Sequence, residues 1–195
     1  MKSRTFVPQK LDVGSFIEST EVLEGQIPVA ELARLAEDLF EQADLAALPP
    51  VTWRAQGRLV KRRVGEPQRW LDLEAHASLP WECQRCLHAV ELPIDVQRSI
   101  RFVADEAAAA ELDADCDDDV LAMSRTFDLI ELIEDELIMA QPLVPRHDQC
   151  PTDVERLMKS EELVDPQGAP AAPEVEAKPH PFAALAALKK NNPKS

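Results

Sequence analysis

Two cysteines three positions apart are the residues of this sequence whose type and spacing could support chemistry. Cys83 and Cys86 frame the tetrapeptide C-Q-R-C, and a C-x-x-C pair lets two thiolates bind one tetrahedral Zn²⁺. His147 and Cys150 could supply two further ligands. The alternative is that the two thiols close a tight turn between strands, because cysteine often acts as a small apolar side chain.

The fourth cysteine does not complete a recognisable metal motif. Cys116 lies in an acidic stretch, far from Cys150, so the sequence has no second C-x-x-C pair. No strand–helix context of the thioredoxin kind surrounds Cys83 and Cys86, which argues against redox chemistry. We therefore assign no cofactor from the sequence and predict well under one zinc per chain, while zinc on Cys83, Cys86, His147 and Cys150 stays open as the alternative.

A basic stretch that contains tryptophan is the second candidate site. The net charge of −15 over 195 residues argues against a simple nucleic-acid binder, which needs clustered cations. Residues 51–103 nevertheless hold nine Lys or Arg against six Asp or Glu, whereas residues 104–195 hold eight against twenty-one. Cations for phosphates and a ring for base stacking suggest RNA binding. The candidates are Arg54, Arg58, Lys61, Arg62, Arg63, Arg69 and Trp70. The alternative is that Trp53 belongs to the core and the charges protect a hairpin edge from pairing.

Patterns typical of enzymes are absent from the sequence. Neither glycine-rich phosphate-binding motif occurs, and no Ser-His-Asp or Cys-His arrangement can be argued from the four histidines. The carboxylates Glu131, Glu134, Asp135 and Glu136 could form an acid–base or metal cluster, but we interpret them as the solvated side of an amphipathic helix. No apolar run approaches the roughly 18 residues of a membrane span, and no signal-peptide core follows the N-terminus. We expect a cytoplasmic protein that is not an enzyme, with no membrane partner and no small-molecule substrate.

Hydrophobic periodicity predicts the elements that position these residues. Residues 21–29 have the pattern of a short strand, and residues 29–44 have the three- and four-residue spacing of a helix. Three further segments alternate with period two, namely 51–59, 71–82 and 90–102, and Arg98 is the one exception to the alternation. Successive half-buried strands predict an antiparallel meander with one buried face and one wet face.

The second half of the chain is predicted to supply helical cover and a tail. Residues 105–120 are rich in carboxylates, which favours a mobile loop with a helical turn at its alanine run. Asp128 is placed to cap a helix that runs to Ala140, and Pro142 stops it.

These elements predict an α+β fold, in which amphipathic helices cover an antiparallel β-meander. We expect residues 1–160 to form a single domain. A flexible Pro-rich linker, 161–180, and a short C-terminal docking helix, 181–190, follow it.

Three sequence blocks, in a fixed order, resemble one known family. The first is L-P-W-E-C-Q-R-C-L at 79–87; the second is D-L-I-E-L-I-E-D-E-L, which leads into P-L-V-P-R-H-D; the third is P-F-A-x-L-A-x-L near the C-terminus. In this order they resemble the bacterial YceD family, the large ribosomal RNA subunit accumulation proteins. The residues that carry the resemblance are Cys83, Arg85, Cys86, Asp128, Glu134, Asp135, Glu136, Pro142, Pro145, His147, Asp148, Cys150, Pro181 and Phe182.

The resemblance implies a protein needed for synthesis, processing or stability of large-subunit (23S-type) ribosomal RNA. It carries over no catalytic residue. The leading hypothesis is a non-enzymatic ribosome-biogenesis factor that binds ribosomal RNA, a ribosomal protein or an assembly factor. The alternatives are a zinc-knuckle module that positions an RNA-processing partner, or an acidic adaptor for a basic ribosomal protein. The C-terminal helix with Phe182 either docks on a partner or folds back on the sheet.

Overall fold

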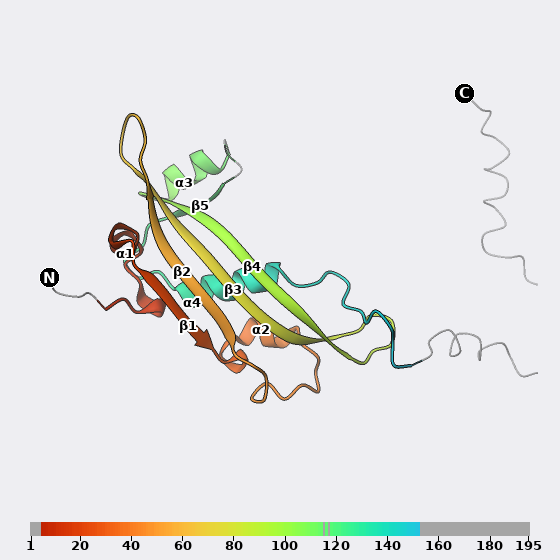
Figure 1. Cartoon of the computed structure of the whole chain (residues 1–195). Coiled ribbons are helices and arrows are strands. Elements are labelled where there is room, and N and C mark those ends of the chain that lie inside the picture. The colour runs from red at the N-terminus through yellow and green to blue at the C-terminus, as the bar shows by residue number, and fades with distance from the viewer. Residues whose placement is uncertain (1–4, 115, 117, 153–195) are drawn as a thin grey trace, which may run out of the picture. The chain divides into compact units, whose positions relative to one another are not determined.

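The computed structural model describes residues 5–114, 116 and 118–152 (Figure 1). The chain divides into two units, Met1–Val154 and Glu155–Ser195, and every described residue belongs to the first. The predicted linker, 161–180, and the predicted docking helix, 181–190, therefore lie outside the described residues.

A five-stranded sheet in the order β1-β2-β3-β4-β5 forms the body of the first unit (Figure 1). The strands are β1 (Val22–Ile27), β2 (Val51–Val60), β3 (Gln68–Glu82), β4 (Ala89–Val103) and β5 (Asp119–Ala122). The first four pair in antiparallel fashion, whereas β5 runs parallel to the end of β4. The predicted antiparallel meander is confirmed.

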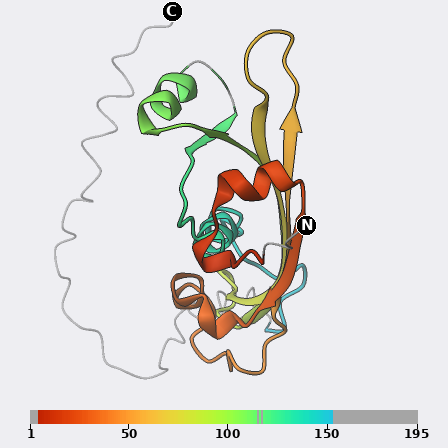
Figure 2. The ribbon, with the colours of Figure 1, turned by 90° about the vertical axis from the view of Figure 1, so that its left-hand side faces the viewer.

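The helices lie on one side of the curved sheet, as Figure 2 shows from the side. They are α1 (Val13–Ser19), α2 (Ala33–Glu37), α3 (Glu106–Asp113) and α4 (Leu129–Met139), with short 3₁₀ turns at Pro8–Lys10 and Val29–Glu31. The predicted α+β class is confirmed. Among the described residues, no helix has the length and apolar character that crossing a bilayer requires.

The core lies between the covered face of the sheet and these helices. Period-two alternation places Trp53, Ala55 and Leu73 on the covered face, where all three are buried. Of the two alternatives for this residue, the one that places Trp53 in the core is confirmed. Gly57 permits the closest approach, because a Cβ atom there would lie 2.5 Å from Ile17 Cα of α1.

The helix predicted over residues 29–44 is wrong in extent. The structure has the turn Val29–Glu31 and the five-residue α2, because Leu32 between them adopts φ −100° and ψ 78°. Beyond α2, the backbone N–H of Phe40 donates to the Pro80 carbonyl at 2.9 Å, so this segment is bonded to β3 and does not continue a helix. The predicted leucine spacing still buries Leu32 and Leu35.

The loop predicted over residues 105–120 is wrong in extent, although the helical turn predicted at its alanine run is present as part of a longer helix. Its first part is the eight-residue helix α3, whose N-terminus is capped by Asp105 accepting from Ala108 N at 2.9 Å. An N-cap followed by alanines favours a helix, and this local preference outweighs repulsion among solvated carboxylates. Its last part enters β5, which our sequence patterns did not predict, and neither did they predict α1.

Candidate functional site

The turn between β3 and β4 carries the C-x-x-C pair. Cys83 directly follows β3, and β4 begins three residues after Cys86. Two backbone hydrogen bonds close the turn, from Leu87 N to Cys83 O at 2.8 Å and from Cys83 N to His88 O at 3.0 Å. Leu87 has φ 59°, a strained conformation for a residue other than glycine, so the turn is held tightly.

The chain after α4 returns to this turn and brings the other two candidate ligands with it. Gln84 N donates to the Pro145 carbonyl at 2.9 Å. The Arg85 side chain donates from Nη2 to the His147 carbonyl at 2.8 Å. These bonds place His147 and Cys150 beside the C-x-x-C pair.

Three sulfur atoms and one imidazole nitrogen converge here. Cys83 Sγ lies 3.9 Å from Cys150 Sγ, and Cys86 Sγ lies 3.5 Å from His147 Nδ1. All four potential ligand atoms lie within 4.8 Å of one another. Cys83 is buried, the other three side chains are half-buried, and all four cysteines of the chain are free thiols. We call Cys83, Cys86, His147 and Cys150 the Cys₃His group.

The electrostatics of the Cys₃His group differ from one thiol to the next. Burial raises the pKa of Cys83, but hydrogen bonds from the backbone N–H groups of Arg85, His147 and Cys86 outweigh burial and lower this pKa to about 5. Burial, together with the neighbouring Cys150 and Cys83, raises the pKa of Cys86. Thiolates this close repel one another unless a cation lies between them. The Cys₃His group could therefore hold a metal ion.

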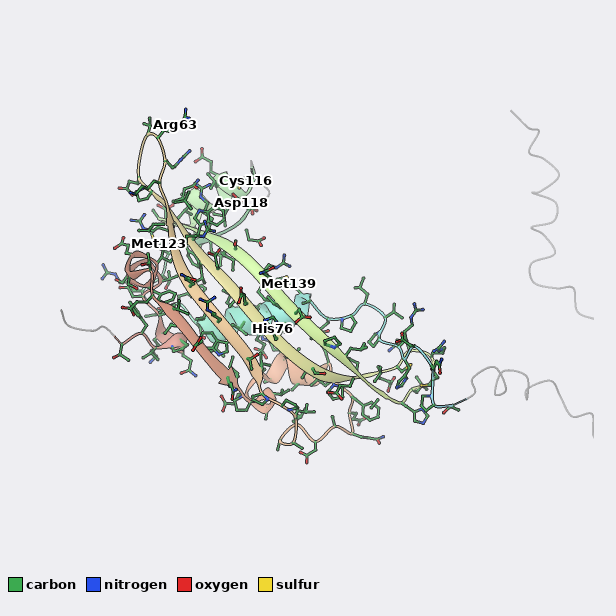
Figure 3. All side chains as sticks on the ribbon, in the orientation of Figure 1. Arg63, His76, Cys116, Asp118, Met123 and Met139 are labelled. Atoms are coloured by element: carbon green, nitrogen blue, oxygen red, sulfur yellow. The ribbon has the colours of Figure 1, made fainter. Side chains whose placement is uncertain are left out.

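The seven predicted RNA-binding residues separate into two sets in the structure. Lys61, Arg62 and Arg63 lie in the loop between β2 and β3, fully on the surface, and Figure 3 places Arg63 at the tip of this hairpin, beyond the end of the sheet. These three side chains make no ion pair with the described residues. Arg54 is exposed on the open face of the sheet and reaches Gln56 Oε1 at 3.4 Å.

The other three predicted RNA-binding residues already have protein partners. Arg58 Nε donates to Asp72 Oδ2 at 2.7 Å, and its guanidinium lies 5.4 Å from the centre of the Trp70 ring. Arg69 pairs with Glu18 at 3.1 Å and with Glu66. Binding of phosphates or bases here would compete with these contacts, whereas the hairpin tip carries no such cost.

Two carboxylates of the α4 motif are buried, so our interpretation of them as solvated is wrong. Glu134 and Glu136 have 9% and 6% of their surface exposed. Glu136 Oε2 accepts from Arg98 Nε at 2.8 Å, which explains why Arg98 breaks the alternation of β4. Asp135 accepts from Arg34 Nη1 at 2.6 Å, while Glu131 is exposed as expected.

Glu134 holds two elements together. Its Oε1 accepts from Arg34 N at 2.8 Å and Leu35 N at 3.2 Å, the first-turn N–H groups of α2, which lacks a capping side chain of its own. Its Oε2 accepts from Arg34 Nη2 at 2.9 Å. These family-motif carboxylates therefore fasten α4 to α2 and β4.

Those of the remaining motif residues that the structure describes cap, end or fasten backbone segments. Asp128 caps α4 as predicted, because its Oδ1 accepts from Ile130 N at 2.9 Å and Glu131 N at 3.1 Å. Pro142 follows the end of α4, and the Asp148 carbonyl accepts from Arg85 Nη2 at 3.4 Å. Pro181 and Phe182 lie outside the described residues.

The Cys₃His group and the basic hairpin lie at opposite ends of β3 (Figure 1). No solved structure matches this chain. The family model described as "Large ribosomal RNA subunit accumulation protein YceD" matches residues 71–189, which is more than half of the chain and includes the C-x-x-C turn, α4 and the segment that carries His147 and Cys150. The chain therefore belongs to the YceD family of large ribosomal RNA subunit accumulation proteins.

Proposed function

We propose that this protein is a non-enzymatic ribosome-biogenesis factor that acts in the cytoplasm and binds large-subunit ribosomal RNA through the tip of its β2–β3 hairpin. The family to which it belongs is named for accumulation of the large ribosomal RNA subunit. The observation that carries the proposal is the run Lys61-Arg62-Arg63, three exposed cations without partners among the described residues.

The position of these cations makes RNA binding compatible with the acidic chain. A net charge of −15 repels phosphates over distances up to a Debye length, about 8–10 Å at physiological salt. The hairpin projects beyond the end of the sheet (Figure 3), so its cations extend past the body of the sheet and α4, although the acidic helix α3 lies at the same end of the sheet (Figure 1). Exposed cations bind phosphates without first breaking an ion pair, which is what distinguishes the tip from Arg58 and Arg69.

The test is the affinity for large-subunit ribosomal RNA fragments as a function of salt. The variant Arg62→Glu with Arg63→Glu should bind more weakly, and its salt dependence should flatten by about 0.7–0.9 in log–log slope for each lost phosphate contact. The matched control is Lys10→Glu with Arg125→Glu, which changes two exposed cations elsewhere and the net charge by the same amount. Equal losses in the two variants would show a general charge effect and refute the interface.

A second candidate function is favoured by the Cys₃His group. In it, the protein is a zinc-knuckle module whose β3–β4 end positions an RNA-processing partner or binds a basic ribosomal protein. Affinity purification from nuclease-treated and untreated halves of one lysate separates the two candidates. Ribosomal components that are lost after nuclease treatment support the hairpin, and a protein partner that survives treatment but is lost on Cys83→Ser supports the knuckle.

A further inference from the structure

We propose that Cys83, Cys86, Cys150 and Nδ1 of His147 bind one Zn²⁺ as a closed, four-coordinate structural site. The ion joins the β3–β4 turn to the chain that follows α4. This inference concerns the opposite end of the sheet from the hairpin tip, and it stands whether or not the tip binds RNA.

The interatomic distances agree with those of a tetrahedral zinc site. With Zn–S near 2.3 Å and Zn–N near 2.0 Å, tetrahedral angles separate two sulfur ligands by about 3.8 Å and a sulfur from a nitrogen by about 3.5 Å. The structure has 3.9 Å between the sulfurs of Cys83 and Cys150. It has 3.5 Å between Cys86 Sγ and His147 Nδ1. The remaining pairs of ligand atoms lie within 4.8 Å of one another, so small side-chain adjustments suffice to accept the ion.

The imidazole of His147 is oriented as a ligand. Its Nε2 lies 3.0 Å from the Ala89 carbonyl, and because a carbonyl oxygen can only accept, Nε2 must carry the proton. Nδ1 is then left with a free lone pair directed at the sulfurs. A ligating histidine typically donates its second N–H to such an outer partner, which fixes the tautomer and the ring.

The charges around the sulfurs favour thiolates. Arg85 Nε donates to Cys150 Sγ at 3.0 Å, and this guanidinium also binds the His147 and Asp148 carbonyls. Three thiolates and one divalent cation leave a net charge of −1, which Arg85 offsets. Arg85 thereby has two roles, because it neutralises the site and holds the ligand-bearing segment in place.

The donor set selects the ion and its role. Three sulfurs and one nitrogen in tetrahedral arrangement favour zinc over magnesium or calcium, which prefer oxygen ligands. A catalytic zinc keeps a position open for water, whereas four protein ligands close the coordination sphere. The ion would therefore act as a cross-link between residues 83–86 and 147–150, in a part of the chain where residues 141–152 form no helix or strand of their own.

The test is the zinc content of the full-length protein, purified under reducing conditions without chelator. In place of the well under one zinc per chain that the sequence predicted, we now expect one zinc per chain in the wild type. Cys116→Ser should also hold one, since Cys116 lies outside the cluster and its Sγ donates to the Asp118 carbonyl. Cys150→Ser and Cys83→Ser should lose most of the zinc. Because Cys83 is buried and its variant could misfold, wild type and Cys150→Ser are also titrated with Co²⁺. Only the wild type should develop the intense absorption of tetrahedral cobalt thiolate.

Three results would overturn the proposal. They are a reduced wild-type protein that stays well below one zinc per chain after incubation with Zn²⁺, equal zinc loss in Cys116→Ser and Cys150→Ser, and a cobalt spectrum without thiolate bands. Binding of ribosomal RNA is measured on the same samples. A wild-type protein that binds ribosomal RNA but takes up no zinc refutes the zinc site alone, whereas one that holds zinc but does not bind ribosomal RNA refutes the hairpin proposal alone.

Discussion

The carboxylate of Glu134 offers the sharpest test of how this fold is held together. Oε1 accepts two backbone N–H groups of α2, from Arg34 and from the buried Leu35. The variant Glu134→Ala would leave both N–H groups without their partner. It would also remove the contact with the Arg34 guanidinium.

The expected loss follows from the backbone bonds alone. A hydrogen bond to a charged acceptor contributes about 1.5–3 kcal/mol, and a buried donor left unsatisfied costs about 1–3 kcal/mol. The guanidinium contact adds little to this loss, because the Arg34 side chain is half exposed and water replaces the carboxylate. Glu134→Ala should therefore lower the free energy of unfolding by about 2–4 kcal/mol, which corresponds to a fall in melting temperature of about 5–15 °C in a chain of this size.

The assay is urea and thermal unfolding of three variants side by side. Glu131→Ala is the matched control, since Glu131 lies on the same helix but is exposed, and it should cost less than about 1 kcal/mol. Glu134→Gln keeps a neutral acceptor for the two N–H groups and should fall between the other two. If Glu134→Ala proves no more destabilising than Glu131→Ala, the cap that α4 supplies to α2 does not contribute to stability.

Three further predictions concern single contacts. Gly57→Ala should lower the free energy of unfolding by about 1–3 kcal/mol, because its Cβ atom would lie against the backbone of α1, whereas Gly14→Ala within α1 should raise it by about 0.4–1 kcal/mol; urea unfolding measures both. Asp128→Ala should cost about 1 kcal/mol through loss of the α4 cap, whereas Asp128→Asn should retain most of it. Arg58 holds the pKa of the Asp72 carboxyl below its ordinary 3.8, so this pair stabilises the folded state above that value and the contribution is lost as the pH falls through the lowered folded pKa. Asp72→Asn should therefore be less stable than wild type at neutral pH, and the difference should vanish in acid; a constant difference would contradict the ion-pair explanation.

Local patterns predicted much of this fold from the sequence alone. Period-two alternation is a property of the extended backbone itself, so the strands from Val51 to Val103 and the buried side of Trp53 could be inferred without tertiary information. The cap at Asp128 is equally local, because the side chain bonds N–H groups two and three residues later. The motifs that resembled the YceD family are confirmed by the match over residues 71–189.

The extent of an element was predicted less well where local helix propensity competes with tertiary contacts. The leucine spacing of residues 29–44 predicts burial correctly but not helix length, because that length depends on backbone partners in β3 and on a carboxylate of α4. A short helix without its own cap forms only where another element supplies the acceptors.

Only the tertiary structure decided what the charged and sulfur-bearing residues do. In the sequence, Arg98 is an exception to the alternation of its strand, and Glu136 has the pattern of a solvated carboxylate. The structure shows that the two side chains, 38 residues apart, form a hydrogen bond. Cys83 and Cys150 are 67 residues apart, and Cys86 and His147 are 61 apart. Spacing along the chain shows which side chains could bind a metal, but whether they meet depends on the return of the chain after α4 to the β3–β4 turn. That path is determined by backbone and guanidinium bonds between distant segments, which no local periodicity encodes.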